Sequence, residues 1–169
     1  MRRILVTGFG PFPGVAVNPT TQLVEAIAAE SLPGIATRLL PTTWQVCADV
    51  AAAAPAFDGV VMFGVAAPAR RIRYERVSLP AAGRHPDATG ELPRAIPRYG
   101  ASRLPVAHLA TAARAAGFPV VLSHSAGTYI CNASYGAALA ANPRTLFVHV
   151  PLPTGHGALS PAGLFDHAM

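Results

Sequence analysis

The chain has 169 residues, of which 51% are hydrophobic and 12% are charged. This composition excludes a disordered chain, and the length suits one domain with a sizeable core. The formal net charge is +5 and no lysine occurs. A nucleic-acid-binding protein would need a longer basic face with interleaved aromatic residues, so we expect no nucleic-acid partner.

The chain start is basic and then apolar, as in a signal peptide. Glycines and prolines between positions 8 and 14 interrupt the apolar segment too early for that assignment. No apolar run reaches the roughly 20 residues that a membrane span needs. The two cysteines, Cys47 and Cys131, are fewer than a secreted disulfide scaffold of this length would show. We therefore expect a cytoplasmic protein without a membrane partner.

Strands and helices alternate along the predicted chain. Residues 3–9 predict a buried strand, and Asn18-Pro19 is typical of a helix start, with asparagine as N-cap and proline in the first turn. A strand at 36–40, a helix at 42–54 and a buried strand at 58–64 follow. This order predicts an α/β fold over residues 1–169, a single-domain three-layer α/β/α sandwich with a largely parallel, twisted central sheet.

Residues 65–104 contain five prolines and three glycines, and they predict an irregular segment of the kind that is usually functional or mobile. A helix is then predicted from Pro105 to about Ala116, and a buried strand at 119–122. A helix-compatible run at 133–141 precedes the last predicted strand, 146–150.

Cys131 and His149 are the candidate nucleophile and base. Cys131 falls where a loop leads into a predicted helix, and the N–H groups and dipole of a helix start help a thiol to lose its proton. His149 lies in the last predicted strand, which stops at Pro151. A lone buried cysteine more often acts as a small hydrophobe, which is our interpretation of Cys47, and a lone strand histidine more often belongs to the core.

Four sequence motifs favour a catalytic role for Cys131 and His149 over a structural one. They are Ser-x-x-Ala-Gly-x-Tyr-x-Cys-Asn at 123–132, Phe-x-His-x-Pro at 147–151, Glu75-Arg76-Val77, and the run from Val6 to Phe12 followed by Asn18-Pro19. Together they resemble, in the same order, the motifs of the pyroglutamyl peptidase I family (pyrrolidone-carboxylate peptidases). The resemblance extends from about residue 3 to about residue 151.

The resemblance implies a cysteine-type omega peptidase that hydrolyses the amide bond after an N-terminal pyroglutamyl (5-oxoprolyl) residue. Cys131 would be the nucleophile that forms a thioester, His149 the general base, and Glu75 the group that orients the imidazole. Such an enzyme needs no cofactor, and we assign no metal site. Its partners would be peptides with an N-terminal pyroglutamate, and the family often forms a homo-oligomer, a tetramer.

The resemblance also indicates a substrate-binding loop. Phe9 and Phe12 would form apolar walls for the flat lactam ring. Asn18 would cap the helix and also recognise substrate through its backbone carbonyl. The other histidines match no motif and should lie on the surface or in loops; they are His85, His108, His124, His156 and His167.

The chain also departs from the family. It has Ala67-Pro68-Ala69 where the family commonly has a Gly-Gly-Arg-like run, the segment to Leu104 is shorter, and residues 152–169 form a poorly matched tail. Two alternatives therefore stay open. One is a weak or inactive family member that binds a small molecule or peptide, and the other is a cysteine amidase acting on another small lactam or acyl amide.

Overall fold

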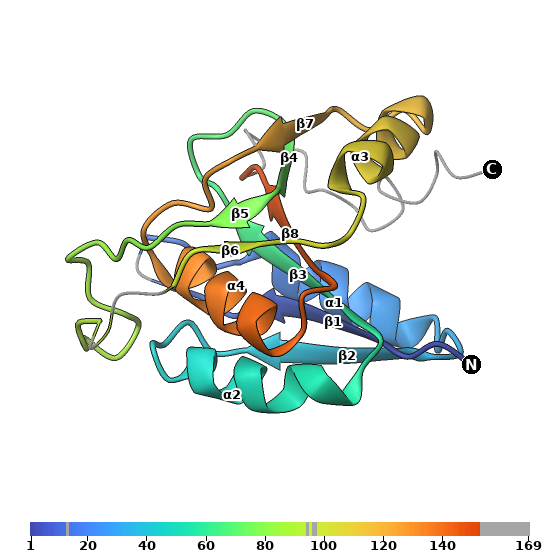
Figure 1. Cartoon of the computed structure of the whole chain (residues 1–169). Coiled ribbons are helices and arrows are strands. Elements are labelled where there is room, and N and C mark those ends of the chain that lie inside the picture. Colours follow the sequence, from blue (N-terminus) through green and yellow to red (C-terminus); the bar gives the residue numbers. More distant parts are fainter. Residues whose placement is uncertain (13, 94, 96–97, 153–169) are drawn as a thin grey trace.

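A computed structural model describes residues 1–12, 14–93, 95 and 98–152. Its main sheet has six strands in the order β2-β1-β3-β8-β4-β7 (Figure 1). Their bounds are β1 Ile4–Phe9, β2 Ile35–Leu40, β3 Gly59–Val65, β4 Ile72–Glu75, β7 Val120–Ser123 and β8 Thr145–Val150. All neighbours are parallel except β4 and β8. The predicted α/β fold with a largely parallel sheet is confirmed.

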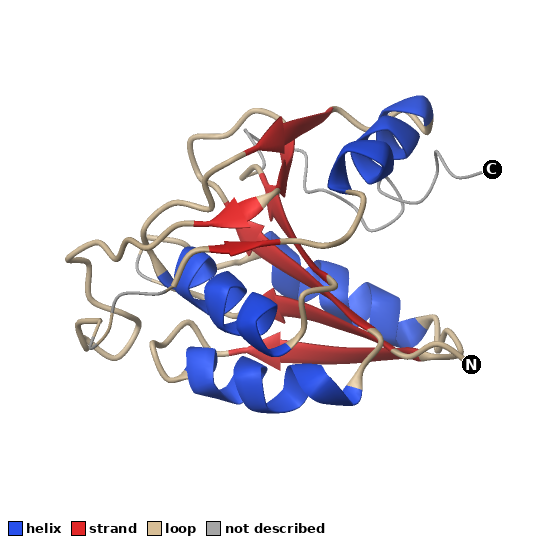
Figure 2. Ribbon diagram, in the orientation of Figure 1, coloured by secondary structure: helices blue, strands red, loops and turns tan. Residues whose placement is uncertain are grey.

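Helices cover both faces of this sheet (Figure 2). They are α1 Pro19–Ala29, α2 Val46–Ala53, α3 Val106–Ala115 and α4 Ile130–Ala141, with a 3-10 turn, η1, at Ala54–Ala56. On one face, α2 and α4 pack against Leu5, Met62 and Phe147. On the other face, α3 packs against Leu146 and Val148. The alternation of side chains along each strand therefore separates two apolar cores.

The start of α1 confirms the predicted cap. The Asn18 side chain accepts a hydrogen bond from the Thr20 N–H at 3.0 Å, and Pro19 is the first helical residue. Gly8 of β1 allows α1 to approach the sheet closely, because a Cβ at this position would lie 2.5 Å from the Thr20 carbonyl oxygen. Together these contacts position the loop between β1 and α1.

Residues 65–104 differ most from expectation, because this segment, predicted as irregular, contributes β4 to the main sheet between β8 and β7. It also forms a small separate sheet from β5, Val77–Ser78, and β6, Gly100–Ala101. The sequence Ile-Arg-Tyr-Glu of β4 does not show the pattern of a buried strand, since alternate residues are charged, and in the structure only Glu75 of β4 is fully buried. The helix predicted at 42–54 is also shorter, because α2 begins only at Val46.

Asp87 organises the loop that follows β5. Its carboxylate accepts hydrogen bonds from the backbone N–H groups of Trp44, Thr89 and Glu91. Burial alone would raise the pKa of this carboxyl, but these hydrogen bonds outweigh burial and lower the pKa to about 2. The loop is therefore attached to the segment before α2.

Two further expectations can be compared with the described residues. His85, His108 and His124 are exposed, as predicted, while His156 and His167 lie outside the described residues, as does the tail from position 153. Among the helices that the structure describes, none combines the length and apolarity needed to cross a bilayer.

Candidate active site

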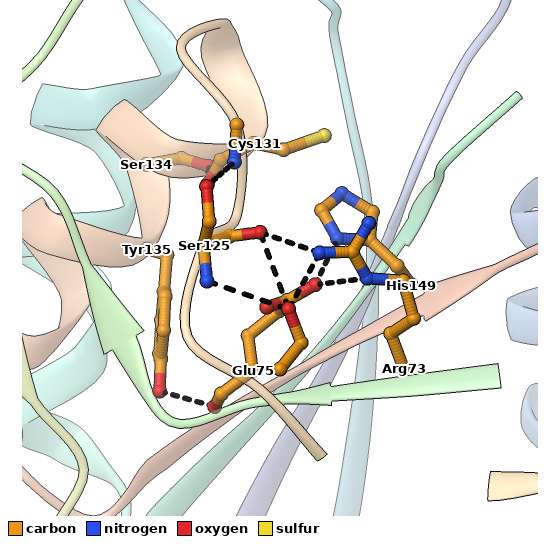
Figure 3. Close-up of polar contacts among 9 residues, drawn as sticks. Arg73, Glu75, Ser125, Cys131, Ser134, Tyr135 and His149 are labelled. Atoms are coloured by element: carbon orange, nitrogen blue, oxygen red, sulfur yellow. Dashed lines mark hydrogen bonds and ion pairs between the residues drawn. The ribbon is translucent and has the colours of Figure 1, made fainter. Parts of the chain in front are cut away.

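Three elements bring together the predicted nucleophile, the predicted general base and the carboxylate predicted to orient the base. Cys131 is the second residue of α4, His149 lies near the end of β8, and Glu75 ends β4. The His149 Nδ1 atom lies 2.8 Å from the Glu75 Oε1 atom, with both side chains buried. Figure 3 shows the imidazole ring between the Cys131 thiol and the Glu75 carboxylate.

The surroundings of His149 favour its protonated form. Burial lowers the pKa of this histidine, but the hydrogen-bonding interaction with the Cys131 side chain and the contact with Glu75 outweigh burial and raise the pKa to about 9. An imidazolium in this position stabilises a neighbouring thiolate. The arrangement therefore places a protonated imidazole beside the Cys131 thiol.

Gly64 makes room for the thiol against the sheet. It is the Cα partner of His149 in the β3–β8 pair. A Cβ at this position would lie 3.0 Å from the Cys131 Sγ atom and 2.7 Å from the Phe147 ring. The absence of a side chain at position 64 is therefore what allows the sulfur to lie beside the imidazole.

We expect Gly64→Ala to reduce turnover by about 10-fold to 100-fold, because the methyl group displaces the thiol from His149. Overpacking should also cost about 1–3 kcal/mol of unfolding free energy. Steady-state kinetics and urea denaturation measure the two effects. Gly10→Ala is the matched control, since its nearest neighbour would be the Leu40 carbonyl oxygen at 3.8 Å. Equal activity of the two variants would contradict this role of Gly64.

Glu75 has further contacts that the sequence did not predict. The Tyr135 hydroxyl donates to the Glu75 backbone carbonyl at 3.0 Å, and the Arg73 Nε atom lies 3.2 Å from Oε1. The Oε2 atom is buried without a hydrogen-bond partner among the described residues. Arginine and glutamate two positions apart in a strand share one face, and this spacing was the available signal for a buried charge pair.

A cavity of about 300 Å³ opens beside Cys131, His149 and Arg73. Its apolar walls are Phe9, Phe12, Val65, Ala66, Ala67, Pro68, Ala126 and Ile130. The polar side chains Asn18, Thr42, Ser125, Thr128 and Tyr129 also line it. A compact ring with a few hydrogen-bonding groups fits a cavity of this composition.

The three predicted binding residues all line this cavity but differ in their surroundings. Phe9 is 2% exposed and packs against Phe147 with ring centroids 6.4 Å apart, so it also belongs to the core. Phe12 is only partly buried. The Asn18 side chain donates to the Gly10 carbonyl at 2.9 Å, and the Asn18 backbone carbonyl accepts from the Thr21 N–H.

Asn132, the residue after Cys131 in the chain, connects the segment after β5 to α4 through side-chain hydrogen bonds. Its side chain donates to the Leu79 and Ala81 carbonyls at 2.9 Å and 3.0 Å and accepts from the Leu79 N–H at 2.8 Å. The Gly83 N–H also donates to the Thr128 carbonyl. The asparagine of the cysteine motif therefore stabilises the site without entering the cavity lining.

A larger cavity, about 590 Å³, lies between α2, α4 and the loop after Asp87, and includes Cys47. It contains none of the predicted site residues. Burial raises the pKa of the Cys47 thiol to about 11, so this cysteine stays protonated at neutral pH. Its packing against the core agrees with the structural role predicted for it.

Known proteins resemble the whole described chain. A family model described as pyroglutamyl peptidase matches residues 2–155. The pyrrolidone-carboxylate peptidase of Vibrio vulnificus is 34% identical over 168 residues, which cover 90% of this chain and 79% of the relative. That of Streptomyces coelicolor is 33% identical over 192 residues, which cover 100% and 89%.

Solved structures show the same likeness. Pyroglutamyl peptidase I from Bacillus amyloliquefaciens superposes with a TM-score of 0.82 at 25% identity, covering 99% of this chain and 93% of that one. The pyrrolidone carboxyl peptidase of Fervidobacterium islandicum gives a TM-score of 0.83 at 25% identity, with coverage of 99% and 95%.

Proposed function

The chain belongs to the pyroglutamyl peptidase family, and we propose that it removes an N-terminal pyroglutamyl residue from peptides as a cysteine peptidase. The observation that carries this proposal is the chain of contacts from Glu75 through His149 to Cys131, which ends at a small, mostly apolar cavity.

In the first step, the Cys131 thiolate attacks the carbonyl carbon of the pyroglutamyl amide bond. The imidazolium of His149 gives its proton to the leaving amine as the C–N bond breaks, which leaves a pyroglutamyl thioester and a neutral histidine. Glu75 orients the His149 ring through its contact with Nδ1, so that Nε2 is the nitrogen that gives and takes protons in the proposed reaction.

In the second step, neutral His149 takes a proton from water, and the hydroxide adds to the thioester carbonyl. The C–S bond then breaks, which restores the thiolate–imidazolium pair and releases pyroglutamic acid, whose carboxyl proton passes to the solvent. The first backbone N–H groups of a helix have no acceptor within it. In α4, which begins at Ile130, the bond from the Ala133 N–H to the carbonyl of the N-cap Tyr129 starts the helical ladder, so the N–H groups before Ala133 have no intrahelical acceptor. Those near Cys131 are our candidates for stabilising the oxyanion in both steps.

The charges around the cavity support a blocked, neutral N-terminus in the substrate. The charged groups that line it are Arg73 and the proposed pair of the Cys131 thiolate and protonated His149, which together carry a net positive charge, and no carboxylate lines the part that the structure describes. A free α-ammonium group would face cations there. A lactam nitrogen carries no charge, so the ring can be buried without an ionic partner.

The proposal is tested with pyroglutamyl-7-amido-4-methylcoumarin beside the glutaminyl, glutamyl and prolyl amides of the same fluorophore. We expect hydrolysis of the pyroglutamyl amide, with kcat/KM for the glutaminyl amide lower by about 100-fold or more, because like charges placed together cost several kcal/mol. Comparable hydrolysis of the glutaminyl amide would contradict the proposal. Binding of pyroglutamate without turnover would instead indicate an inactive binding protein.

Phe12→Ala should lower kcat/KM for the pyroglutamyl amide by an amount equivalent to about 1–3 kcal/mol, because the ring loses one apolar wall. Phe12 is only partly buried, so the melting temperature should change little. Phe9→Ala is the informative comparison, since its side chain is 2% exposed and truncation should also destabilise the fold by about 3–5 kcal/mol. Unchanged kcat/KM in folded Phe12→Ala would remove this residue from the binding site.

A further inference from the structure

We propose that Arg73 is a positioning residue of this active site, which keeps the Glu75 carboxylate charged and in place beside His149. Its Nε atom lies 3.2 Å from Glu75 Oε1, the same oxygen that contacts His149. Arg73 is also the Cα partner of His149 in the antiparallel β4–β8 pair. The register of the sheet therefore sets the guanidinium beside the imidazole (Figure 3).

The guanidinium is held from a second side. Its Nη2 atom donates to the Ser123 Oγ atom at 2.5 Å and to the Ser125 carbonyl at 2.9 Å. Ser123 ends β7, and Ser125 lines the cavity in the segment that leads to α4. Arg73 therefore joins the carboxylate on β4 to the loop that carries Cys131, with its planar fork fixed at both ends.

The ion pair between Arg73 and Glu75 matters because the Glu75 carboxylate is buried. Glu75 is 0% exposed and its Oε2 atom has no hydrogen-bond partner among the described residues. A buried carboxylate needs a cationic partner to remain ionised. His149 supplies one only while it is protonated, whereas Arg73 is charged at every stage. After His149 gives its proton to the leaving amine, Arg73 is the cation that contacts Glu75 in the described part of the chain.

The test compares Arg73→Gln and Arg73→Lys with a control variant, Arg71→Gln. Arg71 is exposed and lies outside the cavity lining, and its substitution changes the net charge by the same amount as Arg73→Gln. We expect Arg73→Gln to lower kcat for the pyroglutamyl amide by about 10-fold or more without raising KM. Arg73→Lys should recover part of the rate, because an ammonium keeps the charge but cannot reach Glu75 and Ser123 together. Arg71→Gln should match the wild type.

A raised KM with an unchanged kcat would overturn the proposal, since Arg73 would then bind substrate. So would a lysine variant no faster than the glutamine variant, because charge at this position would then be unimportant. Melting curves establish that each variant is folded at the assay temperature. If Arg73→Gln is not folded, the lysine variant alone must show reduced kcat at constant KM.

The kinetic comparison rests on the proposed function. A second measurement is therefore added that needs no pyroglutamyl substrate. Iodoacetamide alkylation of Cys131 is followed by mass spectrometry across pH. The titratable groups that interact with this thiol are His149 from β8 and Tyr129 from the preceding loop. Glu75 from β4 contacts His149, and Arg73 from β4 contacts Glu75. In Arg73→Gln, the pH at which alkylation reaches half its maximal rate should rise by about one unit, since one cation near the thiolate is lost.

The two measurements separate the two proposals. If Arg73→Gln shifts the alkylation profile relative to Arg71→Gln but the wild-type protein does not hydrolyse the pyroglutamyl amide, the proposed function is rejected and the role of Arg73 is retained. Turnover of the pyroglutamyl amide, with an alkylation profile of Arg73→Gln identical to that of Arg71→Gln, would reject the role of Arg73 alone.

Discussion

Cys131→Ala is expected to abolish hydrolysis of pyroglutamyl amides, lowering kcat by about four orders of magnitude or more. The thiolate forms the C–S bond in the first step of the proposed reaction, the second step breaks it, and no other thiol lines this cavity among the described residues. Cys131→Ser should be almost as inactive, because a hydroxyl is a much weaker nucleophile than a thiolate beside the same histidine. Steady-state assays at high enzyme concentration measure the residual rate.

Cys47→Ala is the matched control for the nucleophile. Its thiol lies in a different cavity and its pKa is raised to about 11 by burial, so its removal should leave kcat unchanged. Melting curves should show folded protein for all cysteine variants. Residual turnover in Cys131→Ala above about a thousandth of the wild-type rate would show that another group performs the chemistry.

Glu75→Gln is expected to lower kcat by about two to four orders of magnitude. A glutamine can still accept a hydrogen bond from His149, but it carries no charge to stabilise the imidazolium or to pair with Arg73. Glu30→Gln, at an exposed position, is the control. A folded Glu75→Gln enzyme with wild-type kcat would reduce Glu75 to a structural residue.

The same substitution should change how stability depends on pH. The pKa of His149 is raised from 6.5 to about 9 in the folded protein, partly by Glu75. The stabilisation linked to its protonation is therefore fully present below about pH 6.5 and is lost as the pH rises through about 9. Glu75→Gln should weaken this loss, which urea denaturation at about pH 6 and about pH 9.5 can measure. An unchanged pH dependence would contradict the coupling of Glu75 to His149.

The sequence predicted the two central strands of the sheet well because their apolar runs are continuous. Residues 58–64 and 146–150 correspond closely to β3, which is buried or partly buried along its length, and to β8, which is buried on both faces. It did not predict β4, where Arg73 and Glu75 interrupt the apolar pattern. The Glu75 carboxylate is buried in contact with Arg73 and His149. The contact with His149 joins two strands that are distant in the chain, so local sequence does not show it.

Long-range packing also limited the prediction of the site. The closeness of Cys131 and His149 to one cavity follows from the pattern of strand, loop and helix, together with the family motifs. The function of Gly64 depends on what faces it, namely the Cys131 sulfur and the Phe147 ring, which come from two other elements. Phe9 and Phe12 look alike in sequence, yet only the fold shows that Phe9 belongs to the core.

The central claim, that Cys131 forms a pyroglutamyl thioester, is tested most directly by trapping this intermediate. The enzyme is mixed with excess pyroglutamyl amide, quenched in acid within the first turnovers, digested and examined by mass spectrometry. We predict a pyroglutamyl group on the peptide that contains Cys131, accumulating further in Glu75→Gln if that variant slows thioester hydrolysis. Rapid turnover with no adduct on Cys131, or with the adduct on Cys47, would contradict the account.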